Sequence, residues 1–411
     1  MSSGIAVATK KFTHGCHRAV APEQTLEAVA PFLKRAGITR VADVTGLDYP
    51  GVPTVMVTRP NSRSLSVTQG KGLSLEAAKV SGIMEAVEQD HAETPVLALR
   101  LARVSELAGS VCDLANLPRF PRSKGPLTAE TRLLWAEAEC LPTQSKRFVP
   151  FEMVHLDLTL PLPECTGFFP LSSNGLASGN TIEEATTHAL FELVERDARS
   201  LFFLSPRAAR DARRVALATV VDPTCRALID RFQEVGLALA AWDITTDLGI
   251  ASFLVGLMDR EDNAFRRTPL SYGSGAHLDR NVALLRALTE AAQTRLTNIV
   301  GTRDDTLPAH LEHARSPERQ AAYRAELAPD AATARSFQET PHFFFDSFTR
   351  DLNFVLASLA GQGMEQVLRV DLSRPGWPVH VVRLIVPGLE GHIDMSGYVP
   401  GERGAARWNQ A

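Results

Sequence analysis

The sequence predicts a mixed α/β (α+β) fold in which short strands alternate with long helices. Three segments have helical periodicity and share one spacing of polar and acidic residues. Short runs rich in β-branched and aromatic side chains lie between them. The 411 residues are 45% hydrophobic and 22% charged, with a formal net charge of −4. This composition favours a globular protein with a large core and excludes disordered, collagen-like and strongly basic nucleic-acid-binding classes.

The first hundred residues predict a helix, two strands and a second helix. Pro22 opens the first helix, which continues toward Gly37, because proline suits the first helical turn. Residues 55–58 and 64–67 have strand-like composition and are separated by a proline-containing turn. Residues 74–91 follow as the second helix.

The remainder of the chain repeats this alternation. We expect further strands and helices, with strands at 133–135, 148–153, 239–242, 250–256, 367–370 and 379–385, and helices at 181–199 and 281–297. Residues 303–334 are charged and poor in β-branched side chains, which is typical of a helical or mobile surface segment.

We expect a soluble, cytoplasmic protein without a membrane span. The first residues lack the apolar run of a signal peptide, and the apolar run at 250–258 is shorter than the roughly 20 residues that span a bilayer. The five cysteines are scattered and form no C-x-x-C pair: Cys16, Cys112, Cys140, Cys165 and Cys225. This pattern indicates isolated thiols rather than a disulfide framework or a structural zinc site. For Cys16, in the polar stretch 13–18, a reactive thiol or a metal site stays open.

The three helices at 74–91, 181–199 and 281–297, called the repeat helices below, align without gaps. Their shared positions are Ser81-x3-Glu85-x2-Glu88, His188-x3-Glu192-x2-Glu195 and Arg286-x3-Glu290-x2-Gln293. At about 100° per residue, the three positions of each helix fall on one face. We therefore expect the polar groups of each helix to point the same way.

Apolar neighbours such as Ile83, Val87, Leu190 and Val194 place these glutamates beside a core. Paired carboxylates there have raised pKa values and repel each other unless a cation lies between them. Mg²⁺ meets that need, because it takes carboxylate oxygens and completes its shell with water and phosphate. An ordinary solvated helix edge is the alternative for any single helix, whereas the recurrence in three helices favours a site.

Glycine-rich segments, which we expect to be loops, lead into all three repeat helices, at residues 69–72, 172–180 and 271–275. Glycines with adjacent amides and small hydroxyls suit close approach to phosphate or ribose. The sequence contains no Walker A motif and no kinase-like motif set. ATP, if bound, is therefore expected to bind through a carboxylate-held metal.

In the spacing of these polar and acidic residues, the chain resembles the YcaO family of ATP-dependent enzymes that modify peptide backbone amides. The resemblance runs from about Gly15 to Gly388 and includes Asn180-x3-Glu184 and Gly275-x-His277 beside the repeat-helix positions. It implies a YcaO fold with several sheets and the repeat helices converging on a central ATP/Mg²⁺ site. It also implies an N-terminal segment (1–70) that completes this site, a catalytic domain (71–390) and a tail (391–411).

The resemblance implies roles for individual residues. Metal ligands are Glu85, Glu88, Glu192 and Glu195. Nucleotide-contacting residues are Arg18, Thr25, Lys71, Ser81, Asn180, Glu184, His188, Arg196, Arg286, Glu290 and Gln293. Residues assigned to catalysis are Glu85, Glu195, Arg196 and His277. For His277 a proton-transfer role and a structural role both stay open, while His91 and His188 are interpreted as structural or phosphate-contacting.

The implied cofactors are ATP and Mg²⁺, and the implied reaction is phosphorylation of a backbone amide oxygen. Three positions depart from the usual motifs: Gln89 in place of Arg, His188 in place of Gln, and Ala177 where some members have Ser. Residues 46–48, 59–64 and 69–72 are similar to the subgroup encoded beside TfuA proteins, which is associated with thioamide formation.

That subgroup implies a ribosomal peptide or protein substrate, a TfuA-like partner, a sulfur donor and a homodimer, with no nucleic acid. The ending Arg407-Trp408-Asn409-Gln410-Ala411 lacks the proline-rich terminus of many azoline-forming members. Three alternatives stay open: an azoline-forming cyclodehydratase, a non-catalytic ATP-binding scaffold, and an ATP-dependent amide ligase that acts through an acyl phosphate.

Overall fold

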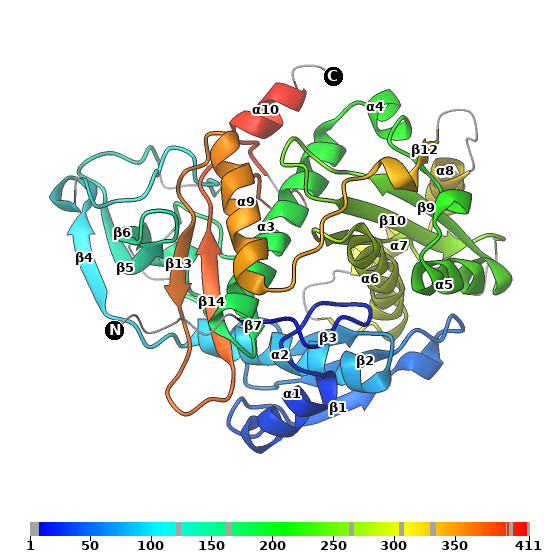
Figure 1. Cartoon of the computed structure of the whole chain (residues 1–411), viewed down its shortest axis with the longest axis horizontal. Helices are drawn as coiled ribbons and strands as arrows, with labels where there is room; N and C mark the ends of the chain where they lie inside the picture. The colour runs from blue at the N-terminus through cyan, green and yellow to red at the C-terminus, as the bar shows by residue number, and fades with distance from the viewer. Residues whose placement is uncertain are drawn as a thin grey trace.

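In the described residues, three larger sheets surround three long helices (Figure 1), and two short strands form a fourth, two-stranded sheet. The computed structural model describes residues 8–107, 109–120, 125–161, 167–262, 267–303, 308–328, 334–391, 393 and 398–408. The long helices are α2 (Leu75–Glu93), α3 (Ile182–Leu204) and α6 (Arg280–Val300), and they are the three repeat helices. This arrangement confirms the predicted mixed α/β fold with several sheets.

The first sheet comes from the N-terminal part of the chain and carries α2. Its antiparallel strands are β1 (Arg40–Asp43), β2 (Thr54–Thr58) and β3 (Val67–Lys71), preceded by α1 (Pro22–Val29). The Ser74 side chain accepts a hydrogen bond from the Ala77 amide and so caps α2 at its N-terminus. Figure 1 shows this sheet below the other two.

The second sheet has six strands and packs against α3. Its strands are β4 (Leu99–Arg103), β5 (Arg132–Cys140), β6 (Ser145–Pro150), β7 (Leu176–Gly179), β13 (Leu368–Asp371) and β14 (His380–Ile385). The central order is β4-β5-β13-β14-β7, with β6 paired to β5. C-terminal strands thus lie between earlier ones, and α9 (Phe348–Gly361) packs beside α3.

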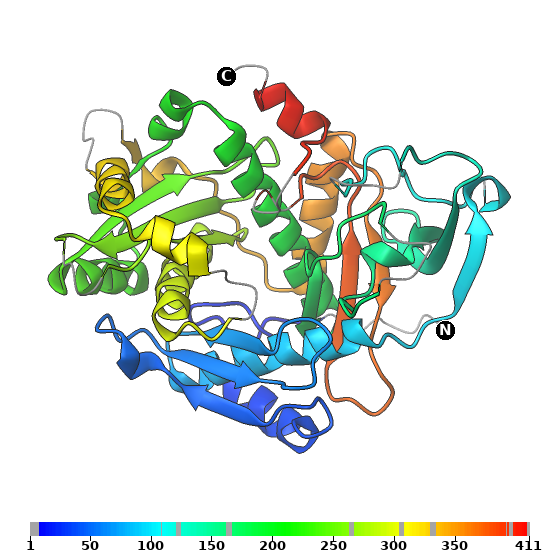
Figure 2. The same ribbon diagram turned by 180° about the vertical axis from the view of Figure 1, so that it is seen from behind.

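The third sheet carries α6 on the opposite side of the molecule, as Figures 1 and 2 both show. Its antiparallel strands are β9 (Leu237–Asp243), β10 (Ser252–Asp259) and β11 (Ser271–Ala276). Helix α5 (Pro223–Glu234) packs against β9 and α6. The remaining elements are α4 (Arg207–Asp211), α7 (Pro308–Ala314), α8 (Pro317–Leu327), α10 (Glu402–Trp408), β8 (Val215–Ala216) and β12 (Arg335–Ser336).

Each repeat helix buries its apolar residues in a different core. Ile83 and Val87 of α2 belong to the core of the first sheet and the six-stranded sheet. Leu190 of α3 packs in the core shared with α9, and Leu288 of α6 packs in that of the third sheet. Because the apolar faces point outward to three cores, the polar faces are left to meet in the centre. Among the described residues, no helix is both long and apolar enough to cross a bilayer.

The structure corrects two expectations about local structure. The predicted strand at 64–67 begins only at Val67, and the glycine-rich segments at 69–72 and 271–275 lie mainly in strands β3 and β11 rather than in loops. Glycine is needed there because a Cβ at Gly70 would lie 1.9 Å from the Ala78 carbonyl oxygen. The sequence also gave no expectation for β1, β4, α5, α9 and α10. In the segment 303–334, α7 and α8 are helical, while residues 304–307 and 329–333 lie outside the described residues.

Candidate nucleotide and metal site

Carboxylates from all three repeat helices face one another at the centre of the molecule. The pKa of Glu88 is raised to about 8, first by burial and then by the neighbouring charges of Glu85 and Glu192. Burial and the charge of Glu195 raise the pKa of Glu192 to about 7, although Arg196 opposes them. These mutual effects show that the predicted metal ligands share one buried environment.

Main-chain and hydroxyl donors, rather than cations, hold two of these carboxylates. The Gln69 amide donates to Glu85 Oε2 at 3.2 Å. Ser178 donates to Glu88 Oε1 twice, from its amide at 2.8 Å and from its hydroxyl at 2.6 Å. Burial also raises the pKa of Glu85, against the Gln69 amide and the charge of Lys71. Both groups are oriented but not neutralised.

Glu195 is held in the same way by the third sheet. The Ser274 hydroxyl donates to Glu195 Oε1 at 2.7 Å. Glu195 Oε2 is buried without a hydrogen-bond partner, and Arg286 Nη2 lies 3.6 Å from it. An orphaned buried carboxylate oxygen is costly unless a ligand completes its coordination.

Glu290 differs from the other glutamates because a lysine pairs with it directly. Lys71 Nζ lies 2.7 Å from Glu290 Oε2. Burial alone would raise the pKa of Glu290, but Lys71 and then Arg196 outweigh it and lower that pKa to about 2. Glu290 is therefore the fixed anion of the site, and it ties the first sheet to α6.

The donor set fits Mg²⁺. A hard divalent cation prefers oxygen ligands, and Mg²⁺ is usually held by one or two carboxylates together with water and substrate phosphates. In the described part of the chain, no three of these glutamates bring ligand atoms within 4.8 Å of one another. The geometry thus matches cations that each take one or two carboxylates, with phosphate and water completing the shell.

A second network lies at the N-terminal end of α3 and joins four of the expected nucleotide-contacting residues. Arg18 Nη1 donates to Glu184 Oε1 at 3.2 Å, and the Asn180 amide donates to Glu184 Oε2 at 3.2 Å. Thr25 donates to the Asn180 side chain at 3.0 Å. The N-terminal segment is thereby fixed against α3 beside the carboxylates.

The other expected nucleotide-contacting residues lie on the three repeat helices. Arg286 Nη1 lies 3.3 Å from His188 Nε2, and burial followed by the charges of Arg18 and Arg286 holds the pKa of His188 well below its usual value. Ser81 lies on α2 one turn before Glu85, and Gln293 lies on α6 one turn after Glu290. Arg196 of α3 acts electrostatically on both Glu192 and Glu290.

His277 lies in an enclosed aromatic environment rather than among the glutamates. Its ring packs against His17 and Phe191, with centroid distances of 4.5 and 4.7 Å. The Asp279 amide donates to His277 Nδ1 at 2.9 Å, so the neutral ring carries its proton on Nε2. Burial holds its pKa well below the usual range. In the neutral ring, Nδ1 is occupied by the Asp279 amide and Nε2–H is the group left to donate.

His17, His277 and Asp351 bring ligand atoms within 4.8 Å of one another, yet a cation already serves this cluster. Lys10 Nζ lies 2.6 Å from Asp351 Oδ2 and 3.2 Å from His17 Nδ1. A metal-bound histidine normally donates its second ring nitrogen, whereas His277 Nδ1 accepts. We interpret the cluster as a buried ion pair that fastens the N-terminal segment to α9.

Four of the five cysteines lie in the described part of the chain, and all four are free thiols. Burial raises the pKa of Cys16, although the neighbouring Arg18 opposes the shift. Cys112, Cys140 and Cys225 are buried free thiols, as the sequence predicts, and Cys165 lies outside the described residues.

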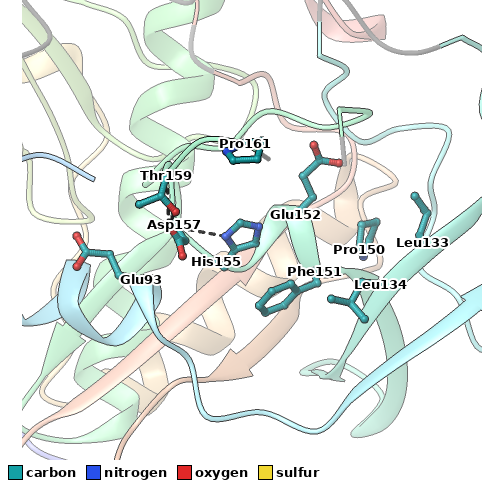
Figure 3. A pocket seen from close by; sticks show the side chains of 10 residues that line it. All are labelled: Glu93, Leu133, Leu134, Pro150, Phe151, Glu152, His155, Asp157, Thr159 and Pro161. Atoms are coloured by element: carbon teal, nitrogen blue, oxygen red, sulfur yellow. Dashed lines mark hydrogen bonds between the residues drawn. The ribbon is translucent and has the colours of Figure 1, made fainter. Parts of the chain in front are cut away.

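A cavity of about 260 Å³ lies apart from the carboxylates, between β5, the turn after β6 and residues 155–161 (Figure 3). His155 stacks on Phe151 at 4.6 Å along its wall. Its acidic residues are already bound, since Glu93 pairs with Arg59 at 2.7 Å and Asp157 accepts from Thr159. None of the site glutamates lines this cavity.

Ser178, Ser274 and Lys10 are functional or supporting residues that the sequence did not single out. The two serines belong to the glycine-rich segments, where each directly precedes a glycine. The Ser-Gly dipeptide was the sequence signal available for both serines. The role of each serine, however, depends on which helix packs against its strand. Lys10 carries no sequence signal, because its partner Asp351 is more than three hundred residues away.

Comparison with known proteins places the chain among a defined set of relatives. The family model described as YcaO cyclodehydratase, ATP- and Mg²⁺-binding, matches residues 69–390. An uncharacterised protein from the region 3′ of tfuA in Rhizobium leguminosarum bv. trifolii is 39% identical over 388 residues, covering 92% of this chain and 90% of the relative. An uncharacterised protein of Methanothermobacter thermautotrophicus is 34% identical over 384 residues, covering 91% and 95%.

Two solved structures share the fold. A heterocyclase in complex with substrate and cofactor superposes with a TM-score of 0.79 at 24% identity, covering 94% of this chain and 54% of the heterocyclase. The chain thus spans about half of that protein. YcaO from Methanopyrus kandleri bound with AMPPCP and Mg²⁺ gives a TM-score of 0.73 at 21% identity, covering 93% and 95%.

Proposed function

The chain belongs to the YcaO family, whose cofactors are ATP and Mg²⁺, and from this premise we propose that it activates peptide backbone amides for thioamide formation. The observation that carries the proposal is the convergence of Glu85, Glu88, Glu192 and Glu195, in which hydroxyl and main-chain donors hold Glu85 and Glu88 and Arg286 Nη2 lies 3.6 Å from Glu195 Oε2. Such a cluster is useful only around a cation.

We propose metal-ligand roles for Glu85, Glu88, Glu192 and Glu195. Arg18 and Arg196 would neutralise phosphate charge, because each is a fixed cation beside the cluster, and Lys71 would do so while paired to Glu290. Ser81, Thr25, Asn180, Glu184, His188, Arg286 and Gln293 would shape the nucleotide pocket around them. His277, as a neutral Nε2 donor, would donate a hydrogen bond rather than abstract a proton.

Bound Mg·ATP supplies the γ-phosphoryl group that converts the amide oxygen into a leaving group. In thioamide formation, hydrosulfide adds to the carbonyl carbon, and the oxygen departs as phosphate. The protein provides no covalent nucleophile in this scheme. Its residues bind, orient and neutralise charge, which is what phosphoryl transfer requires.

The likeness along nearly the whole chain to the protein from the tfuA 3′ region supports thioamide formation with a TfuA-type partner and a sulfur donor. Azoline formation by attack of a substrate Cys, Ser or Thr side chain is the second candidate, favoured by the cyclodehydratase description of the family model and by the heterocyclase fold. The cytoplasmic location and the homodimer stay predictions.

Mass spectrometry of a candidate ribosomal peptide distinguishes these candidates. The purified protein is incubated with peptide, ATP, Mg²⁺, sulfide and the TfuA-type partner. We expect a mass change that corresponds to exchange of oxygen for sulfur, which depends on both ATP and sulfide. Loss of water without sulfide would support azoline formation. An unmodified peptide and no ATP hydrolysis would contradict both activities and favour the scaffold.

A further inference from the structure

The three repeat helices are parts of three similar strand–helix units. In each unit a strand leads directly into its helix: β3 into α2, β7 into α3 and β11 into α6. One glycine of each strand contacts the backbone of an alanine in the helix, and this alanine precedes the first site glutamate of the helix by seven residues. A Cβ at these glycines would collide with helix backbone, at 1.9 Å for Gly70 and Ala78 O, 2.5 Å for Gly179 and Ala185 N, and 2.2 Å for Gly275 and Ala283 O. The close approach is thus the same in all three units.

The residue before each glycine points to a neighbouring unit. Ser178, before Gly179, donates its hydroxyl to Glu88 at 2.6 Å, and α2 belongs to the preceding unit. Ser274, before Gly275, donates its hydroxyl to Glu195 at 2.7 Å, and α3 belongs to the unit before that strand. Both glutamates occupy the second acidic position of their helices. The two junctions therefore share the hydrogen bond from the serine hydroxyl to Oε1, and they differ in the serine amide, which donates to Glu88 from Ser178 and to Glu290 from Ser274.

The third junction closes the ring between β3 and α6, but its chemistry differs. Gln69 stands where the other strands have serine, and Gln293 stands where the other helices have the second glutamate. The Gln69 side chain accepts a hydrogen bond from Thr297 of α6. Amides replace the hydroxyl and the carboxylate, so this junction offers no anionic ligand to a cation.

We propose that Ser178 and Ser274 are equivalent positioning residues for two cation subsites, one at each serine–glutamate junction, and that the Gln69–Gln293 junction holds no cation. This inference rests on the proposed metal roles of Glu88 and Glu195. Each hydroxyl binds Oε1. Among the described residues, Glu195 Oε2 accepts no hydrogen bond, although Arg286 Nη2 lies 3.6 Å from it, and the hydrogen bonds to Glu88 both end on Oε1. The serine thus fixes the carboxylate plane and leaves one oxygen directed to the metal.

The test measures Mn²⁺ binding by EPR, with a non-hydrolysable ATP analogue present, in Ser178→Ala and Ser274→Ala. Loss of an outer partner of a metal ligand weakens metal affinity by about 10- to 100-fold, and we expect each variant to weaken one of two bound ions by that factor. Ser178→Cys and Ser274→Cys, which are close in volume, serve where an alanine variant does not fold, and the same weakening is expected.

Ser200→Ala is the matched control. Ser200 lies on α3, is equally buried, and donates its hydroxyl to the Gly391 carbonyl at 2.6 Å rather than to a carboxylate. We expect this variant to bind Mn²⁺ as the wild type does. Equal affinities in the wild type and both serine variants, or equal weakening in Ser200→Ala, would overturn the inference alone. A wild type without nucleotide-dependent Mn²⁺ binding would overturn the metal roles as well.

Discussion

Two sets of charged residues on the same three helices follow opposite rules. The site glutamates lie at the shared positions of the repeat helices and mostly lack a paired cation. Two residues beyond the third shared position, each helix carries another charge: Asp90, Asp197 or Arg295. Asp90 pairs with Arg374 at 2.6 Å, and Asp197 pairs with Arg403 at 3.0 Å. These charges are neutralised by ion pairs, whereas Glu85 and Glu88 of the site are held by hydroxyl and main-chain donors.

The network around Arg295 shows the contrast within one helix. Arg295 is fully buried and reaches Asp48 at 2.8 Å and Asp259 at 3.0 Å. Burial would raise the pKa of Asp259, but the Tyr49 hydroxyl and Arg295 outweigh it and lower that pKa. Glu88 has no such partner, and its pKa rises to about 8. Burial is thus common to both carboxylates, and the difference between them is the counter-charge that Asp259 has and Glu88 lacks.

The largest expected effect on stability comes from removing Arg295 from its ion pairs with Asp48 and Asp259. Arg295→Met leaves Asp48 and Asp259 buried without their cation, so we expect the free energy of unfolding to fall by about 3–5 kcal/mol. Chemical denaturation measures this change. A loss below about 1 kcal/mol would show that these ion pairs do not maintain the fold.

The second prediction concerns ATP turnover when a site glutamate is replaced. Glu85→Gln and Glu195→Gln should each reduce Mg-dependent ATP turnover by at least about a hundredfold, near 2.7 kcal/mol, with little effect on folding. Steady-state ATPase assays measure it. Glu137→Gln, at an exposed pair with Lys146, is the control and should retain wild-type turnover. Full activity in both site variants would remove the metal assignment.

The pH dependence of stability sharpens the comparison further. Glu88 and Glu192 have pKa values of about 8 and 7 in the folded protein, above the value of 4.5 in the unfolded chain. Their contribution to the free energy of unfolding is therefore fully present below pH 4.5 and is lost as the pH rises through the folded pKa values. Between pH 6.5 and 8, the free energy of unfolding should fall by about 2 kcal/mol without Mg·ATP. Below pH 6.5, His17, whose pKa is lowered to about 4, opposes the trend. Denaturant titrations across this range test the slope, and a flat profile would contradict it.

The smallest expected effect is a gain in stability, whereas substitution of a buried residue ordinarily lowers the free energy of unfolding. Glu192→Gln removes an uncompensated charge, so at pH 8 the nucleotide-free protein should become more stable by about 1 kcal/mol. The same variant should lose the additional stabilisation that Mg·ATP gives the wild type. Thermal melting with and without Mg·ATP measures both changes. Destabilisation of the free protein by Glu192→Gln would place Glu192 with the structural charges.

The repeat helices and their glutamates could be predicted because helical spacing is local and was present three times. The fold class also followed from local periodicity. The six-stranded sheet could not be derived in this way, because β13 inserts beside β5 from more than two hundred residues away. The ion pair of Lys10 and Asp351 likewise depends on segments that meet only after folding.

The glycine-rich segments show a different limit. Their composition was interpreted as loops for phosphate approach, since glycine is common in turns. In β3 and β11 the glycines instead allow a strand to contact its helix, and the adjacent Ser274 holds a glutamate. The residues were recognised, but their roles depend on tertiary neighbours that the sequence does not name.

Protonated, unpaired carboxylates of the site are proposed to bind a cation, and the most direct test of this proposal is the release of protons when Mg·ATP binds. Calorimetric titration at pH 7 in two buffers of different ionisation enthalpy measures it. We predict net release of protons, because Mg²⁺ displaces them from Glu88 and Glu192, and no tight ATP binding when Mg²⁺ is chelated. Binding of equal affinity in both conditions with no proton exchange would contradict the account.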